Sequence, residues 1–398
     1  MNKLKKVVLV ANDVGGVGGM ERHLEEMIQR MKNDYEVTVV SSSLRIPSQD
    51  GIRFIHIPAV RRPFPLMTLM FSTYASLRVH FLARHSIVHT TGAILLTKAD
   101  VCTVHFCHAG WQSAAGESQT YDSVLHRVNH KVGMWIKLWM ERYCYHPAQT
   151  RHLVPVSQRV NRELAEFYPY PRRQVRVISN GVDTEKFHPA THTEKHQLRA
   201  QFGLPTDGTY VIFMGGDWER KGVRYLLEAF NQLAPVYANL HVLIVGSGDA
   251  ARFAEYVDDK YIHHIHFVGK QSNPDIWYRM SDVFVFPSNY EACSLAVLEA
   301  AASGLAMVVT NVGGADDIVK DGETGYLVER DVDSIRFKLQ YLLDFPHEIE
   351  RVGNQIRQVV ASLTWDETYR QFSNLYQSIA REKGHHGLEQ PQQPALNR

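Results

Sequence analysis

Short runs of β-branched and aromatic residues alternate with helical sequence along this chain, and the alternation starts twice. The first series of strand-like runs lies at 6–11, 36–41, 54–57, 86–90 and 101–106. Helical patterns separate some of these runs, at 20–32, 66–84 and 122–144. Strands that alternate with helices are typical of βαβ units on a parallel sheet. The first half of the chain therefore predicts a doubly wound α/β domain, which V-R-V-I-S (175–179) extends with a further strand.

A second series of strand-like runs follows the polar stretch 188–208. It comprises V-I-F-M-G-G (211–216), H-V-L-I-V-G (241–246), I-H-F-V-G (265–269), V-F-V-F-P (283–287) and A-M-V-V-T (306–310). Two separate parallel sheets of about 170 residues each fit ordinary domain sizes better than one large sheet. We therefore expect Rossmann-like domains at 1–186 and 187–363 that face each other across a cleft, and a disordered polar tail at 383–398.

The charge balance disfavours one class of partner. Lys and Arg number 43 and Asp and Glu number 42, so the formal net charge is +1 and a strongly basic nucleic-acid binder is disfavoured. Basic residues outnumber acidic ones over 1–173, and the reverse holds for the remainder. The basic first half suits an anionic partner or a membrane surface, although ordinary solvated faces explain it equally well.

Cysteine usage and the apolar segments bear on the compartment. The 4 cysteines lack zinc or redox spacing, which favours a reducing compartment. The apolar run within residues 1–11 is too short for a signal peptide, and the mostly apolar stretch 64–77 is too short to cross a bilayer. We expect a cytoplasmic protein without a transmembrane segment.

A glycine-rich turn, A-N-D-V-G-G-V-G-G-M-E-R-H (11–23), follows the first strand and opens a helix. Gly16, Gly18 and Gly19 allow close approach of the backbone, and a helix N-terminus attracts phosphate. The spacing of a dinucleotide fingerprint fails, because Glu21 stands where the third glycine belongs. We expect a phosphate or sugar contact from this loop rather than a nicotinamide or flavin site; a loop that is glycine-rich only in order to turn is the alternative.

Two glutamates eight residues apart stand in N-Y-E-A-C-S-L-A-V-L-E-A-A-A-S-G-L (289–305). Eight residues of helix change direction by only about 80°, so Glu291 and Glu299 can border one cleft. Carboxylates accept hydrogen bonds from the vicinal hydroxyls of sugars and ribose. The backbone N–H groups of Cys293, Ser294 and Leu295 would point from the helix start at an anion. A capping role for Glu291 and a solvated or paired carboxylate for Glu299 are the structural alternatives.

The turn F-M-G-G-D-W-E-R-K-G-V (213–223) places two cations at the next helix. Gly215 and Gly216 end a strand, and Arg220 and Lys221 are expected to begin the helix that follows. Cations at a helix N-terminus oppose the helix dipole, and a bound phosphate would make that placement tolerable. The pattern favours a phosphate site over a solvated surface pair.

As a set, these motifs resemble the family 4 glycosyltransferases of the GT-B fold. G-G-V-G-G-M-E-R-H, V-P-V-S, I-S-N-G-V-D, E-R-K-G, V-G-S-G, F-V-G, the paired glutamates, V-G-G-x-x-D and D-G-E-T-G-Y occur in the family's order over most of residues 6–330. The forms E-A-C-S-L-A-V-L-E-A-A-A-S-G-L and F-x-x-x-x-E-R-K-G are most like the branch that contains lipopolysaccharide core glucosyltransferases.

The resemblance implies a nucleotide-sugar donor on the second domain and the acceptor on the first. Glu299 would bind the ribose hydroxyls, while Glu291 and the amides that follow it would hold the donor sugar. Arg220 and Lys221 would neutralise the diphosphate leaving group. The loop from Gly16 to Gly19 would reach across from the first domain, and a helix over 364–382 would cross back onto that domain. The family implies neither a metal nor another cofactor, and the scattered histidines lack ligand spacing.

The chain also departs from the family pattern, and its acceptor side is ambiguous. Gly216 stands where many members carry arginine, and Asp317 replaces the usual glutamate of V-G-G-x-x-E. In V-C-T-V-H-F-C-H-A-G-W (101–111), His105 and His108 both compete for the family's histidine near the reacting carbon. Strand alternation would put them on opposite faces. Trp111 and the basic-apolar stretch 59–71 can touch a lipid-linked acceptor or a membrane, although a core helix with a polar side is slightly preferred.

The resemblance thus predicts a retaining, metal-independent hexosyltransferase of polysaccharide or lipopolysaccharide biosynthesis, with UDP as the expected nucleotide on family frequency. Its acceptor would be a glycan or a lipid-linked molecule, and the enzyme would contact the membrane peripherally from the cytoplasmic side. A sugar-nucleotide epimerase of the same fold and a catalytically idle nucleotide-sugar-binding protein are the alternatives. A dehydrogenase is a distant third, since the glycine spacing fails.

Overall fold

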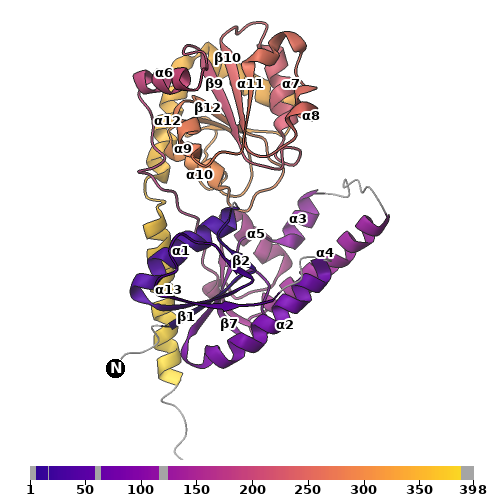
Figure 1. Cartoon of the computed structure of the whole chain (residues 1–398), viewed down its shortest axis with the longest axis vertical. Helices are drawn as coiled ribbons and strands as arrows, with labels where there is room; N and C mark the ends of the chain where they lie inside the picture. The colour runs from indigo at the N-terminus through magenta and orange to yellow at the C-terminus, as the bar shows by residue number, and fades with distance from the viewer. Residues whose placement is uncertain (1–5, 17, 59–63, 116–123, 387–398) are drawn as a thin grey trace, which may run out of the picture.

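Two α/β units stacked along the long axis make up the chain in the computed structural model, which describes residues 6–16, 18–58, 64–115 and 124–386 (Figure 1). The first unit holds six parallel strands in the order β5-β3-β1-β6-β7-β8. In chain order these are β1 (Lys6–Val10), β3 (Glu36–Ser41), β5 (Ile52–His56), β6 (Ile87–Thr91), β7 (Ala99–Val104) and β8 (Thr150–Pro155). A separate two-stranded parallel sheet consists of β2 (Asp13–Val14), which follows β1 in the chain, and β4 (Ser43–Leu44), which follows β3.

The second unit repeats the same arrangement. Its six parallel strands run in the order β11-β10-β9-β12-β13-β14. They are β9 (Thr209–Met214), β10 (Leu240–Val245), β11 (Ile265–Gly269), β12 (Val283–Phe286), β13 (Ala306–Thr310) and β14 (Tyr326–Val328). Both sheets reverse strand order beside their first strand, and ligands of such sheets bind outside the carboxyl ends of the strands at this point.

Helices cover both sheets. Those of the first half are α1 (Gly19–Asp34), α2 (Phe64–Leu82), α3 (His108–Ala115), α4 (Val124–Cys144) and α5 (Gln158–Phe167). Those of the second half are α6 (His192–Gln201), α7 (Val223–Leu233), α8 (Ala250–Ala254), α9 (Pro274–Arg279), α10 (Leu295–Ala302), α11 (Val332–Asp344), α12 (Pro346–Val360) and α13 (Trp365–His386). Short 3-10 turns lie at Ala83–His85, Arg172–Gln174 and Asp259–His264.

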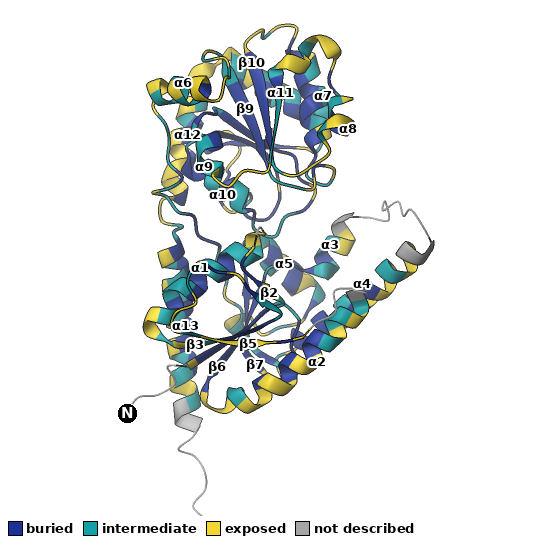
Figure 2. Ribbon diagram, viewed as in Figure 1, coloured by how far each residue is buried: buried dark blue, intermediate teal, exposed yellow. Residues whose placement is uncertain are grey.

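The two-sheet prediction is confirmed, and the reason is visible in the burial of the strands. β10, β12 and β13 are buried along their whole length, as expected for parallel strands covered on both faces (Figure 2). Their content of Val, Ile, Leu and Phe, interrupted by few polar residues, is what made them recognisable in the sequence.

Local predictions were wrong at a few places. V-R-V-I-S is not a strand, because it follows β8 with only two backbone hydrogen bonds, Arg176 N–H to the Leu153 carbonyl and Ile178 N–H to the Pro155 carbonyl. The polar stretch 188–208 contains α6, which a capping box at Thr191 and Glu194 begins. Helix α3 and strand β14 were not predicted.

The last helix belongs to the core of the first unit although it follows the second in the chain. Phe372, Leu375, Tyr376 and Ile379 of α13 are buried in one cluster with α1, β1 and β3. The Lys383 ammonium pairs with Asp100 at 2.6 Å and fixes the end of the helix to the first sheet. Helix α13 runs to His386, so the tail predicted from 383 starts later, and its remainder, 387–398, lies outside the described residues.

No helix among the described residues combines the length and apolarity that spanning a membrane requires.

Replacing Phe372 with alanine tests the contribution of α13 to the first unit. The Phe372 side chain is fully buried and its ring stacks on His89 with centroids 5.3 Å apart. Deleting a buried aromatic ring costs about 3–5 kcal/mol of unfolding free energy, so calorimetry should show a clearly lower unfolding temperature. Arg370→Ala, at an exposed position on the same helix, is the control. Equal unfolding temperatures for the two variants would contradict this role.

Candidate functional site

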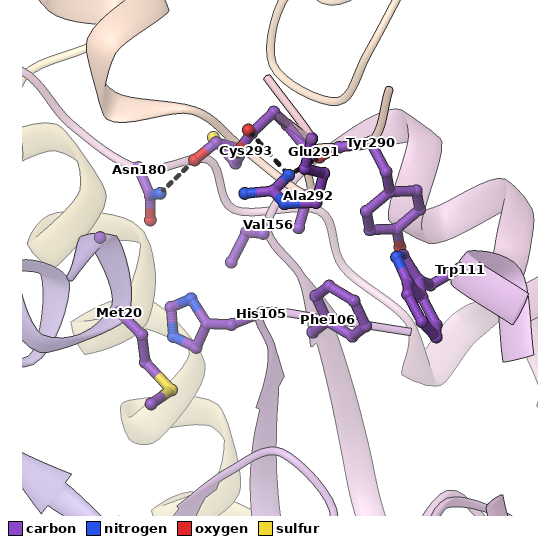
Figure 3. Close-up of a pocket in the computed structure, with 12 residues that line it drawn as sticks. Met20, His105, Phe106, Trp111, Val156, Asn180, Tyr290, Glu291, Ala292 and Cys293 are labelled. Atoms are coloured by element: carbon purple, nitrogen blue, oxygen red, sulfur yellow. Dashed lines mark hydrogen bonds and ion pairs between the residues drawn. The ribbon is translucent and has the colours of Figure 1, made fainter. Parts of the chain in front are cut away.

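A cavity of about 400 Å³ lies between the two units, at the carboxyl ends of both sheets (Figure 3). Both halves of the chain supply its walls. The lining residues are Gly19, Met20, His105, Phe106, Trp111, Val156, Asn180, Arg220, Tyr290, Glu291, Ala292 and Cys293. Several residues predicted from motifs far apart in sequence therefore meet in one place, namely Gly19, His105, Arg220, Glu291 and Cys293.

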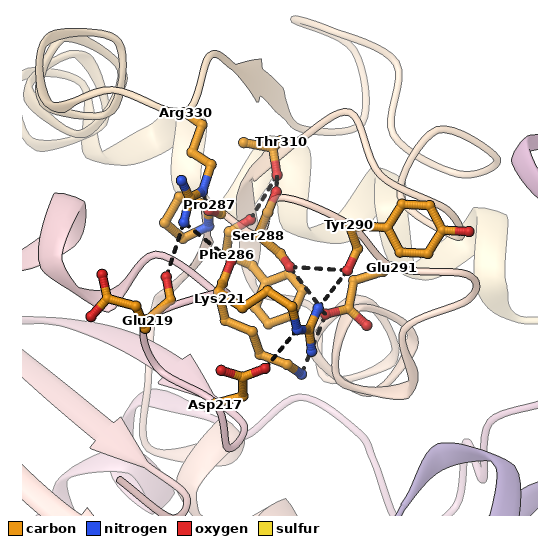
Figure 4. A network of polar contacts seen from close by, with 11 residues as sticks. Asp217, Glu219, Lys221, Phe286, Pro287, Ser288, Tyr290, Glu291, Thr310 and Arg330 are labelled. Carbon is orange, nitrogen blue, oxygen red and sulfur yellow. Dashed lines mark hydrogen bonds and ion pairs between the residues drawn. The ribbon is translucent and has the colours of Figure 1, made fainter. Parts of the chain in front are cut away.

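Glu291 is the centre of charge at this cavity (Figure 4). One carboxylate oxygen, Oε1, lies 3.2 Å from Arg220 Nη1, 3.5 Å from Lys221 Nζ and 3.1 Å from the Ser288 hydroxyl. Burial alone would lower the pKa of Arg220, but the neighbouring charges of Glu291 and Asp217 raise it. The two cations predicted to bind phosphate are thus both partnered by one carboxylate.

The cationic turn precedes its helix rather than starting it. Helix α7 begins at Val223, with Gly222 as its N-cap in the left-handed region at φ 79°. A Cβ on Gly222 would lie 2.3 Å from the Pro287 carbonyl oxygen, so this position requires glycine. Arg220 and Lys221 therefore lie in the loop before α7, where the close approach of the turn to β12 directs them toward Glu291.

One of the three backbone N–H groups predicted to bind an anion donates to a neighbouring loop. Helix α10 begins at Leu295, and Ser294 N–H donates to the Gly313 carbonyl at 3.3 Å. Gly313 N–H in turn donates to the Glu291 carbonyl at 3.0 Å, so the loop after β12 is joined to the loop after β13. The Ser294 N–H therefore has an acceptor within the protein, and its binding of an anion stays a prediction.

Glu299 lies on α10, outside the residues that line the cavity. It accepts a hydrogen bond from the Tyr278 hydroxyl at 3.2 Å. Burial raises the pKa of Glu299 to about 7, against the opposing effect of Tyr278 and of the charges of Lys186 and Arg22. Arg22 belongs to α1 of the first unit, so this carboxylate faces the junction between the units. The two glutamates consequently differ: Glu291 is paired with two cations, whereas Glu299 is partly buried and has a raised pKa.

The two candidate histidines have separate environments. Strand β7 ends at Val104, so strand alternation does not apply to either residue, although only one of the two, His105, is among the cavity-lining residues. The His105 ring lines the cavity, and its Nε2 is buried with no hydrogen-bond partner among the described residues. His108 begins α3 and its Nδ1 lies 2.7 Å from the buried carboxylate of Glu141, outside the cavity lining.

His105 is held neutral by its surroundings. Burial, and then the proximity of His23 and His89, lowers its pKa well below the ordinary value. The rings of His23 and His105 lie 4.6 Å apart, edge to face. A neutral ring with one buried, unpaired nitrogen at a cavity wall is a hydrogen-bonding group prepared for a ligand.

The glycine loop approaches the second unit at its helix start. Gly19 opens α1, and a Cβ there would lie 3.8 Å from the Leu295 side chain of α10. Gly16 has φ 152°, which L side chains rarely adopt, so this position favours glycine. A Cβ on Gly18 would lie 2.0 Å from the Glu21 carboxylate, the movable end of a flexible side chain. Only Gly19 of the predicted loop residues lines the cavity. Gly216, at the end of β9, lies instead beside Ser247, whose hydroxyl would be 2.9 Å from a Cβ.

Asn180 is a site residue that motif reasoning did not single out. Its side-chain Nδ2 donates to the Cys293 carbonyl at 3.2 Å, and its Oδ1 lies 3.0 Å from His23 Nδ1. The residue therefore connects the first unit to the loop that carries Glu291. The motif I-S-N-G-V-D contained this signal, since an asparagine in a tight loop next to a cleft supplies both donor and acceptor groups.

No group of three or more His, Cys, Asp or Glu residues suited to a metal ion is found within the described part of the chain.

Comparison with known proteins places the two units in families. The family described as Glycosyltransferase Family 4 matches residues 17–186, and the one described as Glycosyl transferases group 1 matches residues 194–359. The chain is a family 4 glycosyltransferase of the GT-B fold. An uncharacterized glycosyltransferase of Methanocaldococcus jannaschii is 25% identical to this glycosyltransferase over 384 residues, which are 90% of this chain and 94% of the relative.

A second relative has a named reaction. UDP-Gal:alpha-D-GlcNAc-diphosphoundecaprenol alpha-1,3-galactosyltransferase of Escherichia coli is 28% identical over 303 residues, covering 72% of this chain and 73% of the relative. Among solved structures, WaaG, a glycosyltransferase involved in lipopolysaccharide biosynthesis, matches with a TM-score of 0.78 and 16% identity over 93% of this chain and 99% of WaaG. Anabaena HepE in complex with UDP and glucose matches with a TM-score of 0.69 and 13% identity over 94% and 99% of the two chains.

The raised pKa of Glu299 predicts a specific pH dependence of stability. A carboxyl with a pKa of about 7 when folded and 4.5 as its ordinary value contributes stability at low pH that is lost as pH rises through 7. Glu299→Gln should therefore unfold at a higher temperature than the wild type at pH 8, and the difference should shrink toward pH 5. Glu228→Gln, at a paired surface position on α7, is the control. A difference that does not vary with pH would contradict this interpretation.

Proposed function

We propose that this glycosyltransferase moves a hexose from a UDP-sugar to a glycan or lipid-linked acceptor, with retention of the anomeric configuration and without a metal. The observation that carries the proposal is the meeting of Arg220, Lys221 and Glu291 at a cavity that both units line. Cations beside a carboxylate suit a donor that has a diphosphate next to a sugar. The reaction of the E. coli relative, which uses a UDP-sugar and a diphosphoundecaprenol acceptor, is consistent with this assignment.

Each residue then has a defined role. The diphosphate would take Arg220 and Lys221 as partners in place of Glu291, and the freed carboxylate would accept hydrogen bonds from the donor sugar. Glu299 would accept from the ribose hydroxyls, and the N–H groups of Cys293 and Leu295 would face the sugar or phosphate. Because the two cations and the helix starts neutralise the leaving diphosphate, no metal ion is needed in this scheme.

The first unit would contribute the remaining contacts. The loop at Gly16, Gly18 and Gly19 would approach the phosphates, and His105 Nε2 would hydrogen-bond a hydroxyl of the donor sugar near the reacting carbon. Retention would follow if the acceptor hydroxyl attacks from the face that the diphosphate leaves, with the phosphate taking its proton. A double displacement requires a nucleophilic carboxylate, and Glu291, the carboxylate among the cavity-lining residues, is paired with two cations.

Membrane contact of the first unit is a further part of this proposal. On α4, Val128, Val132, Trp135 and Trp139 form an exposed stripe at helical spacing, and Trp135 is 67% exposed. On α2, which packs against α4, the exposed apolar residues are Leu66, Leu69, Leu77 and Phe81, and Phe81 is 82% exposed.

The exposed charged side chains near these stripes are basic. Helix α2 contains no acidic residue, and the acid of α4, Glu141, is buried. Exposed Arg78 and Lys131 accompany the two stripes. Aromatic residues with flanking cations suit the interface of an anionic membrane, which would hold a lipid-linked acceptor at the cytoplasmic face.

Nucleotide binding tests the donor assignment. At one hundred times its dissociation constant, UDP should stabilise the wild type by about 2.7 kcal/mol, which a thermal-shift assay detects easily. Glu299→Ala should lose most of that shift, whereas Glu228→Ala should keep it.

Incubation with UDP-glucose and UDP-galactose, followed by NMR of the product's anomeric configuration, tests transfer and retention. Stabilisation by NADH alone would overturn the proposal. Conversion of the donor to its epimer would establish the epimerase alternative. Binding of UDP without turnover of any acceptor would establish the catalytically idle binding protein.

Vesicle binding tests the membrane contact. The wild type should co-sediment with vesicles of phosphatidylethanolamine and phosphatidylglycerol, and less so at high salt. Phe81→Ser combined with Trp135→Ser should weaken binding at least about tenfold, since each buried ring contributes about 1.5–3 kcal/mol. Val236→Ser removes a 74% exposed apolar side chain from the second unit and should change nothing. Equal binding by the double variant would disprove this docking face.

A further inference from the structure

Helix α5 of the first unit is the platform on which the second unit sits. Four residues within its first two turns reach across. These contacts join Gln158 N–H to the Asp317 carboxylate, Arg159 to the Asn311 carbonyl, Arg162 to Asp316, and Glu163 to Tyr290. Their partners lie in two loops, the one after β12 and the one after β13, and these same loops are joined to each other through Glu291 and Gly313.

The Tyr290 side chain reaches from the second unit into the first. It belongs to the loop after β12, yet its side chain is 1% exposed and lies among residues of the first unit. Its ring lies 5.1 Å from the Phe106 ring and 5.3 Å below the Arg159 guanidinium. Its hydroxyl donates to Glu163 Oε2 at 2.8 Å and lies 3.4 Å from the Cys107 carbonyl oxygen. The side chain is therefore fixed entirely by the first unit.

The main chain of Tyr290 is fixed by the second unit. Its carbonyl accepts a hydrogen bond from Arg220 Nη1 at 2.6 Å. The next residue, Glu291, forms ion pairs with both Arg220 and Lys221 (Figure 4). One residue thus connects the carboxylate of Glu163 on α5 to the cationic turn proposed to hold the diphosphate. A shift of the Tyr290 side chain would move the Arg220 acceptor and the Glu291 carboxylate together.

Glu163 is held in one position. Its Oε1 accepts from Arg159 Nε at 3.1 Å, and a Cβ on Gly110 would lie only 2.4 Å from its carboxyl carbon. Helix α3 therefore approaches α5 closely because residue 110 has no side chain. A carboxylate with this little freedom can set the place of the hydroxyl that it binds.

We propose that Tyr290 and Glu163 are positioning residues that hold Arg220 and Glu291 in their reactive arrangement when the two units are closed. The proposal rests on the proposed function, because it assigns the cationic turn to the donor diphosphate. Neither side chain needs to touch the donor. Their contribution is to transmit the position of the first unit, which carries the acceptor, to the groups around the leaving phosphate.

The test compares Tyr290→Phe with a matched control. Removing the hydroxyl leaves the fold's ring contacts intact and should lower kcat about 10- to 100-fold, the cost of a small misplacement of reacting groups. The stoichiometry of UDP binding, measured by titration calorimetry, should stay at the wild-type value. Tyr326→Phe is the control, because Tyr326 is equally buried and donates to Glu348 at 3.0 Å within the second unit. It should keep the wild-type kcat.

Two further variants separate positioning from simple stability. Glu163→Gln retains an acceptor for the Tyr290 hydroxyl and should keep most of kcat, whereas Glu163→Ala should match Tyr290→Phe. Gly110→Ala should displace the Glu163 carboxyl and lower kcat to the same degree, although no polar group is removed. Combining Tyr290→Phe with Glu163→Ala should cost no more than either single change.

The outcomes distinguish this proposal from the one on which it rests. A wild type that neither binds UDP nor transfers a hexose overturns the proposed function, and the positioning role with it. An active wild type whose Tyr290→Phe variant has an unchanged kcat overturns the positioning role alone. A kcat that falls only in proportion to the fraction of protein able to bind UDP also overturns it, because that is the signature of partial unfolding. A fall in kcat at full UDP stoichiometry, together with rescue by Glu163→Gln, supports it.

Discussion

The pairing of one carboxylate with two cations organises the second unit's side of the cavity. Glu291 meets Arg220 and Lys221 through a single oxygen, in a half-buried corner where unpaired charge would be costly. Gly222 and Gly215, both at positive φ, permit the turn that brings the cations there. Because this arrangement forms as the chain folds, a diphosphate would meet cations that are already oriented and partly desolvated, which lowers the cost of binding.

A column of neutral polar side chains supports the other wall of the cavity. His89 lies between the Tyr376 hydroxyl of α13 and the Thr103 hydroxyl, each at 2.6 Å, and burial lowers its pKa to about 3. His23 continues the column to Asn180, and its pKa is lowered to about 4, mainly by burial. These histidines resemble a catalytic cluster in composition, but their hydrogen bonds are satisfied within the protein. His105 Nε2, buried and unpaired at the cavity wall, is the point where the column meets the ligand space.

The sequence determines the sheets more directly than the site. Buried parallel strands are continuous apolar runs, so β9, β10, β12 and β13 could be read from composition, and glycine and charge patterns identified the turns that end near the cavity. The choice between His105 and His108 could not be made, because it depends on β7 ending at Val104 and on Glu141, 33 residues later, holding His108. The acceptor of the Ser294 amide could not be predicted for a similar reason, since Gly313 is brought by a neighbouring loop. Contacts that form between loops leave no periodic pattern in the chain.

The path of the chain joins the two units along one edge. It passes between them twice, and the crossings lie side by side: Val182 N–H donates to the Leu363 carbonyl at 2.8 Å, and a Cβ on Gly181 would lie 2.4 Å from the Trp365 nitrogen. In Figure 1 this crossing lies at the edge of the molecule beside α13, whereas α5 lies closer to its middle. The contacts of Tyr290 and Asp317 with α5 lie away from this crossing and join the two units a second time. The side chains that join the units here belong to the loop after β12, which lines the cavity, and to the loop after β13, which is hydrogen-bonded to it, so the contacts between the units and one wall of the cavity depend on the same loops.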